Sequence, residues 1–139
     1  MFQLAYSSAA SAPFTTEALQ LLLLKARETN LACNVTGMLL YHTGSFLQVL
    51  EGPEASVEHI FASIERDSRH HHIQVLFRKH TDDREFAEWH MGLIDTSPWH
   101  LIPGMIDYHR VLQVATASTA AQRYLRLFHQ GLCRQARLV

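Results

Sequence analysis

The chain has 139 residues, of which 47% are hydrophobic and 18% charged, and this content suits one domain with its own core. A formal net charge of −1 at pH 7 argues against a nucleic-acid binder, which would need a basic surface. Two distant cysteines without a CxxC spacing, Cys33 and Cys133, indicate reduced thiols. The sequence shows neither a typical signal peptide nor a segment that could span a bilayer, so we expect a soluble cytoplasmic protein.

The first predicted elements are a strand and an apolar helix. Residues 2–7 alternate between large apolar side chains and smaller or polar ones, which is the pattern of a strand. The following helix is capped by Thr15 or Thr16, has Glu17 in its first turn and runs to about Thr29. Its buried stripe is predicted to consist of Ala18, Leu19, Leu22, Leu23 and Ala26.

A hairpin is predicted next. Residues 35–42 form a nearly continuous apolar run, and Thr43 with Gly44 supplies a tight turn. Residues 45–51 then return as a second strand.

Gln48 is the one amide inside this returning strand. It shares a face with Phe46 and Leu50, while Leu47 and Val49 occupy the other face, so we expect the strand to be covered on both sides. A buried amide without partners would cost about 1–3 kcal/mol. We therefore expect a polar group from elsewhere in the core to satisfy Gln48, and a ligand is one source of such a group.

A second helix is predicted after the hairpin. Gly52 ends the strand, Pro53 takes the first helical position, and Glu54 lies near the positive end of the helix. One buried stripe follows at the i, i+3, i+4, i+7 spacing: Val57, Ile60, Phe61 and Ile64.

Two more strands are predicted beyond this helix. Residues 73–80 read as a fourth strand and residues 82–86 as a turn or short helix. Residues 88–94 form a fifth strand that carries Trp89 and Met91 on one face.

The order is βαββαβ plus a fifth strand, which indicates an α+β, ferredoxin-like fold with two helices over one face of the sheet. Thr119 and Gln122 form a capping box for a last helix, so we expect a domain over residues 1–95 and a C-terminal helical extension over residues 96–139. Because Asp107 is the last acidic residue, the extension is basic, as either a solvated helix face or a contact surface for another subunit or protein.

Patterns for other chemistry are weak. His70, His71 and His72 are consecutive, so alternate strand faces allow at most two of them to share a metal, and no carboxylate partner is evident. The sequence contains no Gly-rich phosphate loop, nucleophile elbow or pair of catalytic carboxylates. We expect neither a metal site nor an enzyme.

Five features occur in order along the chain: Tyr6, Asn30, the run VTGMLLYHTGSFLQVLEG, the run ERDSRHHHI and the run EFAEWHMGL. Together they resemble the BLUF domain, a blue-light sensor that holds a flavin non-covalently. The resemblance covers residues 1 to about 95. It implies the ferredoxin-like fold and a flavin ring that lies between the two helices, against the central sheet.

The resemblance also implies a role for each matching residue. Tyr6 would give an electron to the photoexcited flavin, and Gln48 would bridge the Tyr6 hydroxyl and the flavin N5 and C4 carbonyl edge, so that its rotation or tautomerisation is the switch. Asn30, just past the first helix, would bond the pyrimidine side of the flavin. Thr29 stands where the family often has histidine or a second asparagine.

Two further groups of residues match the family. One is a charged cluster that would close the ribityl and phosphate end of the pocket, made of Arg66, Asp67, Arg69 and His70. The other is the pair Trp89 and Met91, of which one packs near Gln48 according to the signalling state. The residues alone leave open which of the two faces inward.

The implied function is that of a blue-light photoreceptor with FAD, with FMN and riboflavin as alternatives in the same pocket. Since no output domain is recognised, the signal is expected to leave through protein contacts, within a homo-oligomer or with a downstream protein partner. Two other classes remain as rivals: an acylphosphatase-like small phosphate-hydrolysing enzyme, and a ferredoxin-like RNA-binding module.

Overall fold

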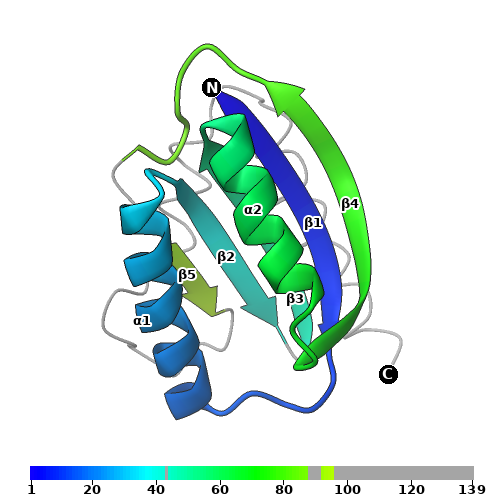
Figure 1. Cartoon of the computed structure of the whole chain (residues 1–139). Coiled ribbons are helices and arrows are strands. Elements are labelled where there is room, and N and C mark those ends of the chain that lie inside the picture. The colour runs from blue at the N-terminus through cyan, green and yellow to red at the C-terminus, as the bar shows by residue number, and fades with distance from the viewer. Residues whose placement is uncertain (43, 88–91, 96–139) are drawn as a thin grey trace.

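The computed structural model of the chain describes residues 1–42, 44–87 and 92–95 (Figure 1). Its elements are β1 (Phe2–Ala10), α1 (Thr16–Ala32), β2 (Thr36–His42), β3 (Ser45–Gly52), α2 (Glu54–Glu65), β4 (His70–His80) and β5 (Gly92–Asp95). This order confirms the predicted ferredoxin-like α+β fold with a further strand.

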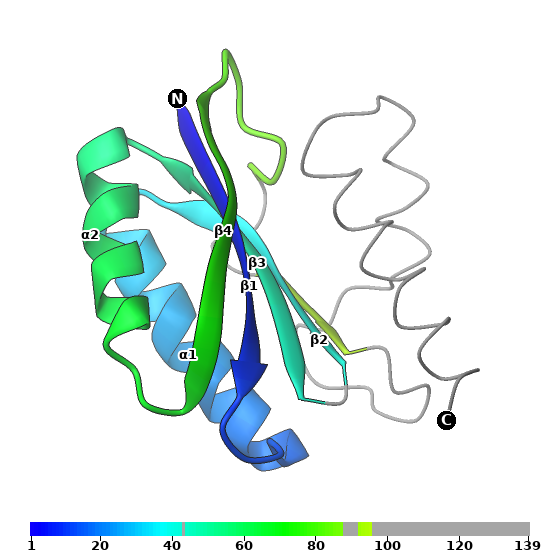
Figure 2. The same ribbon diagram turned by 90° about the vertical axis from the view of Figure 1, so that its right-hand side faces the viewer.

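The strands form one five-stranded sheet in the order β4-β1-β3-β2-β5. Neighbouring strands are antiparallel except β5, which runs parallel to β2. Both helices cover the same face of the sheet, as the edge-on view in Figure 2 shows. The three inner strands, β1, β3 and β2, lie beneath the helix layer.

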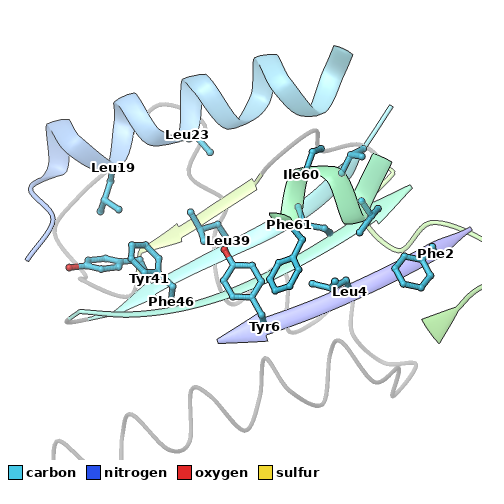
Figure 3. Close-up of a cluster of buried hydrophobic side chains, with 13 residues drawn as sticks. Phe2, Leu4, Tyr6, Leu19, Leu23, Leu39, Tyr41, Phe46, Ile60 and Phe61 are labelled. Atoms are coloured by element: carbon cyan, nitrogen blue, oxygen red, sulfur yellow. The ribbon is translucent and has the colours of Figure 1, made fainter. Parts of the chain in front are cut away.

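The sheet carries a core on each face. On the helix side, aromatic and aliphatic side chains of both layers pack together (Figure 3), with the Tyr41 and Phe46 ring centroids 4.8 Å apart. On the opposite face a second cluster contains Ala5, Met38, Leu40, Leu47, Val49 and Phe86. The prediction that β3 is buried on both sides is confirmed.

Helix α1 begins as predicted but ends later. The Thr15 side chain caps it by accepting a hydrogen bond from the Ala18 backbone N–H at 3.1 Å. Asn30 lies in the last turn of the helix, so the expectation that it follows the helix is wrong. The residue that breaks the helical path is Asn34, with φ of 56°, because asparagine tolerates the left-handed region better than most residues do.

The other boundaries shift by one to three residues. Helix α2 begins at Glu54, so Pro53 is its capping residue and not its first helical residue. Strand β4 begins at His70 rather than at residue 73, and β1 continues to Ala10, because these two ends pair with each other. Register shifts in this pair, together with a φ of 54° at His72, interrupt the alternation that marks a strand in sequence.

Two predicted features lie outside the described residues. They are the start of the fifth strand, with Trp89 and Met91, and the extension over residues 96–139 with its terminal helix. Within the described part of the chain, no helix is long and apolar enough to cross a membrane.

Candidate flavin-binding site

A cavity of about 300 Å³ lies between the two helices and the sheet. Its lining comes from one stripe of each helix and from the central strands, and includes Leu22, Ala26, Thr29 and Asn30 of α1, Ile60, Ser63 and Ile64 of α2, and Tyr6, Leu39, Phe46 and Gln48 of the sheet. The helices thus supply two walls of apolar and polar side chains, and the sheet supplies a floor with a phenol and an amide. A cavity of this size is at the lower end of the range for small-molecule sites, about 300–1,000 Å³.

Tyr6 and Gln48 meet on this floor because β1 and β3 pair in register at these two residues. The Tyr6 hydroxyl donates a short hydrogen bond to Gln48 Oε1, and both side chains are buried. Gln48 Nε2 can only donate, so rotation of the amide would turn a donor toward Tyr6 in place of the acceptor. The geometry thus places an exchangeable hydrogen-bond pattern at the edge of the cavity.

The surroundings of Tyr6 keep its phenol protonated. Burial raises the pKa of Tyr6 far above its ordinary value, and the negative charge of Asp67 raises it further. The Tyr6 ring also packs against Phe61, with ring centroids 5.4 Å apart (Figure 3). In the ground state, Tyr6 is therefore a neutral hydrogen-bond donor.

An ion pair lies among the lining residues where α2 leads into β4. The Arg69 side chain donates to both carboxylate oxygens of Asp67, at 3.0 Å from Nε and 2.5 Å from a terminal nitrogen. The hydrogen bonds from the Arg69 side chain are the main reason that the pKa of Asp67 falls to about 2. This carboxylate is therefore ionised throughout the neutral pH range.

His70 also lines the cavity, but its ring nitrogens have protein partners. Nε2 lies 2.6 Å from the carbonyl oxygen of Ile64, to which it must donate. Nδ1 lies 2.8 Å from the Ser8 hydroxyl and, in the neutral ring, accepts from it. His70 thus links β1 to the end of α2 through two hydrogen bonds, and its imidazole ring forms part of the cavity wall.

Comparison with known proteins identifies the family. A sequence profile described as sensors of blue-light using FAD, the BLUF family, matches residues 1–92. The chain belongs to the BLUF family. A BLUF domain is a flavin-binding photosensor and is not itself catalytic.

Named relatives also match the chain. The chain is 39% identical over 70 residues to the blue light- and temperature-regulated antirepressor BluF of Escherichia coli (strain K12), which covers 50% of this chain and 17% of the relative. It is 28% identical over 123 residues to photoactivated adenylate cyclase subunit beta of Euglena longa, which covers 88% of this chain and 14% of the relative. The matches thus span less than a fifth of these longer proteins.

A solved structure has a similar fold. BlrP1 of Klebsiella pneumoniae, in a manganese and cy-diGMP complex at pH 9.0, superimposes with a TM-score of 0.77 at 29% identity. The superposition covers 91% of this chain and 32% of that chain. Membership of the BLUF family does not favour the two alternative functions considered from the sequence, the phosphate-hydrolysing enzyme and the RNA-binding module.

Most residues that the BLUF resemblance singled out and that the structure describes line the cavity. Tyr6, Asn30, Gln48, Asp67, Arg69 and His70 are among its lining residues. Arg66 is not: it follows α2 directly, is exposed, and donates to the Ser63 hydroxyl at 3.5 Å. Trp89 and Met91 lie outside the described residues.

Sequence reasoning missed Phe14 and Leu39, and it also missed four residues on the helix segments: Lys25 and Cys33 of the α1 segment, and His59 and Ser63 of α2. Their spacing contained a signal. Lys25, Thr29 and Cys33 recur every four residues, and His59 and Ser63 have the same spacing, so each set follows one helix face. Across the described ranges, no group of three or more His, Cys, Asp or Glu side chains is placed to hold a metal ion.

Proposed function

We propose that Tyr6 and Gln48 form the light-driven switch of this BLUF domain. The observation that carries the proposal is the buried hydrogen bond from the Tyr6 hydroxyl to Gln48 Oε1 on the cavity floor. Flavin, when bound, absorbs blue light and takes up an electron. Tyr6 is the tyrosine among the lining residues, and a phenol suits electron donation because it sheds its proton as it is oxidised.

The proton follows the electron along the existing hydrogen bond. In the dark, the raised pKa of Tyr6 keeps the proton on its oxygen. Once Tyr6 has lost an electron, the proton moves toward Gln48, whose amide then rotates or tautomerises and presents a different donor and acceptor. The electron and the proton both return to Tyr6, so the cycle has no net redox change and only the Gln48 arrangement differs.

The cavity residues fit a flavin. Apolar side chains of α1 and α2, such as Ala26 and Ile60, would lie against a flat ring, and buried polar groups would be available to its edges. We assign Asn30 to the pyrimidine edge and the Asp67–Arg69 pair, with His70, to the rim. Arg66 stays a weaker candidate because it does not line the cavity.

The flavin is proposed to be FAD, with FMN and riboflavin as alternatives. Lys25 supports a flavin that carries phosphate, because it adds an exposed cation to the cavity lining. The family description also names FAD. A cytoplasmic location is proposed because Cys33 is a free thiol, which suits a reducing compartment.

The output is proposed to pass through protein contacts. The relatives are named as an antirepressor and as cyclase subunits, which supports an output that depends on the protein joined to the sensor. We propose residues 1–95 as the sensor and residues 96–139 as the output segment, acting within a homo-oligomer or on a downstream protein. Trp89 or Met91 is the proposed contact from Gln48 toward that segment.

The decisive experiment is the absorption spectrum of the flavin-loaded protein before and after blue light. We expect a small, reversible red shift in the parent and its loss in Tyr6→Phe and Gln48→Ala. The control is Tyr41→Phe, because Tyr41 is buried in the helix-side core but does not line the cavity. A reversible shift that persists in both site variants would refute the assignment of the switch.

A further inference from the structure

The carboxylate of Glu51 is completely buried on the face of the sheet that lies opposite the cavity. Its exposed fraction is 0%, and it lies three positions after Gln48 on β3, where strand alternation turns it to the other face. A buried carboxylate costs several kcal/mol unless hydrogen bonds and opposite charge offset its lost hydration. Its partners therefore indicate why the fold retains it.

Four hydrogen bonds hold this carboxylate. Oε1 accepts from the Thr36 hydroxyl at 3.0 Å and from the Phe86 backbone N–H at 2.6 Å. Oε2 accepts from the Glu85 backbone N–H at 2.9 Å and from the Gln3 amide at 3.3 Å. Gln3 and Thr36 lie directly opposite Glu51 on β1 and β2. The other two donors come from the chain that follows β4.

Arg84 supplies the opposite charge beside the same point. One terminal nitrogen donates to the Thr36 hydroxyl at 2.8 Å and to the backbone carbonyl of Glu51 at 3.0 Å. The other donates to the backbone carbonyl of Asn34 at 2.7 Å. The consecutive residues 84–86 all bind Glu51 or its neighbour Thr36. We call this group, Glu51 and Thr36 with residues 84–86, the Glu51 clamp.

The clamp lies on the route from one edge of the sheet to the other. Strands β4 and β5 are the two edge strands, and the chain leaves β4 at the end of the sheet near the N-terminus (Figure 1). Phe86 is buried in the core of the far face, next to Met38 and other residues of β1, β2 and β3. The clamp therefore determines where the crossing chain meets the sheet before it reaches β5.

The pairing of β5 connects this anchor to the switch. Leu93 of β5 pairs with Leu39 of β2, and Leu39 pairs with Gln48 of β3. Gln48 pairs in turn with Tyr6, so the four residues form one row across the sheet. A slip of the chain at residues 84–86 would move β5 relative to this row.

We propose that Glu51 is a positioning residue that anchors residues 84–86 and so sets the register of β5 beside the Gln48 row. Its part in signalling depends on the proposed function of Tyr6 and Gln48. When the hydrogen bonds of the Glu51 clamp are intact, residues 84–86 are fixed and β5 responds to a change at Gln48. When these bonds are broken, the photochemistry continues but β5 no longer responds to it.

The test is hydrogen exchange on the full-length, flavin-loaded protein in the dark and under blue light. Glu51→Gln replaces one acceptor oxygen with a donor, so the Glu85 or the Phe86 N–H loses its acceptor. We expect at least about tenfold faster dark exchange at the amide that loses its acceptor. We also expect the red shift to persist, while the light-minus-dark exchange difference in β5 is lost.

Glu58→Gln is the matched control because it makes the same chemical change at an exposed carboxylate on α2, which pairs with Arg78 at 2.8 Å. It should leave exchange at residues 84–86 and in β5 unchanged. Arg84→Gln is the second variant, for use if Glu51→Gln does not fold, because it retains all four donors to the carboxylate. It should loosen the same amides to a smaller extent.

Parent-like protection of the Glu85 and Phe86 amides in the folded variants would overturn the proposal. A parent-like light response in β5 after the amides have loosened would do the same. Loss of the red shift in Glu51→Gln with flavin still bound would place Glu51 in the photochemistry and also overturn it. If the parent itself shows no red shift, the proposed function fails, whereas dark exchange still tests the anchor.

Discussion

The Tyr6 hydroxyl donates to the Gln48 amide oxygen where both side chains are largely buried. Their side chains are 3% and 6% exposed, so loss of either partner leaves the other short of a hydrogen bond, at a cost of about 1–3 kcal/mol. The same burial raises the pKa of Tyr6. The hydrogen bond thus stabilises the core, and burial keeps the Tyr6 phenol protonated.

Lys25 provides a test of flavin choice at the level of a single side chain. It makes no hydrogen bond or ion pair with the part of the chain that the structure describes, and it is exposed in the cavity lining. We expect Lys25→Gln to weaken FAD and FMN binding by up to about fivefold, because an exposed ion pair contributes roughly 0.2–1 kcal/mol. Flavin fluorescence titrations at low and high salt measure this, and the effect should shrink with salt.

Riboflavin is the control ligand because it lacks phosphate, and its affinity should not change. Lys79→Gln is the control variant, since Lys79 lies near the Phe77 ring on β4 and does not line the cavity. An equal loss of affinity for all three flavins would argue that Lys25 contacts the ring or acts on the fold.

Strand β3 is the element on which the two functional faces meet. Gln48 faces the helices and Glu51 faces the far side, and between them Val49 and Leu50 are fully buried, one on each face. The strand pairs with β1 on one side and β2 on the other over nearly its whole length. It is therefore a stiff support for both side chains.

The end of β3 gives a stability prediction. A Cβ added at Gly52 would lie 2.8 Å from the carbonyl oxygen of Asn34 and 3.3 Å from the Cα of Val35, so Gly52→Ala forces backbone atoms apart. We expect it to lower the free energy of unfolding by about 1–3 kcal/mol, the usual cost of overpacking. Urea denaturation followed by circular dichroism measures the change.

Gly44→Asn is the control for this prediction. Gly44 has φ of 84° and nothing within 4 Å of an added Cβ, and asparagine accepts positive φ more readily than most residues. Its cost should stay below about 1 kcal/mol. A Gly52→Ala variant as stable as the parent would show that the α1–β2 connection moves aside freely.

At the scale of the whole molecule, the sheet separates the cavity from the Glu51 clamp. The helix-side face holds the cavity, and the opposite face holds the second core and the Glu51 clamp. Strands β1, β2 and β3 contribute residues to both. In the proposed switch, a change at Gln48 would have to cross or travel along this sheet to reach the far face.

The basic extension gives a prediction about assembly. In the full chain, we expect simultaneous substitution of Arg123, Arg126, Arg134 and Arg137 by glutamine to weaken oligomer formation while the red shift stays unchanged. The reason is that these arginines follow the last acidic residue and can pair with carboxylates of a second subunit. Sedimentation velocity in the dark and under blue light measures the assembly. Unchanged size in both conditions would exclude these arginines as an assembly surface.

Local patterns predicted much of the fold because they follow from neighbouring residues. Both strands of the hairpin, the α2 stripe and the Thr15 cap all depend on alternation, helical spacing or one capping side chain. The errors in the strand bounds arose where pairing between distant segments decided the outcome. Strand β4 starts at His70 because Ala10 pairs with it, and no local pattern around His70 indicates this.

The site was predictable in part for the same reason. The buried amide at Gln48 was evident from its apolar strand, whereas Tyr6 alternated like any core residue and gained its meaning from the family resemblance. Sequence could not reveal that Glu51 is buried or that Arg84 lies beside it, because a glutamate at a strand end is usually solvated.

The order of the elements and the burial of β3 on both faces followed from the amino-acid sequence alone, since each depends on residue type and short-range spacing. The family followed from the resemblance of separated segments to the BLUF domain. Three features depended on the folded chain: the Tyr6–Gln48 hydrogen bond, the placement of His70 against Ser8 and Ile64, and the Glu51 clamp. Each joins residues that strand pairing or helix packing brings together. Such contacts depend on register and crossing direction, which local patterns do not specify.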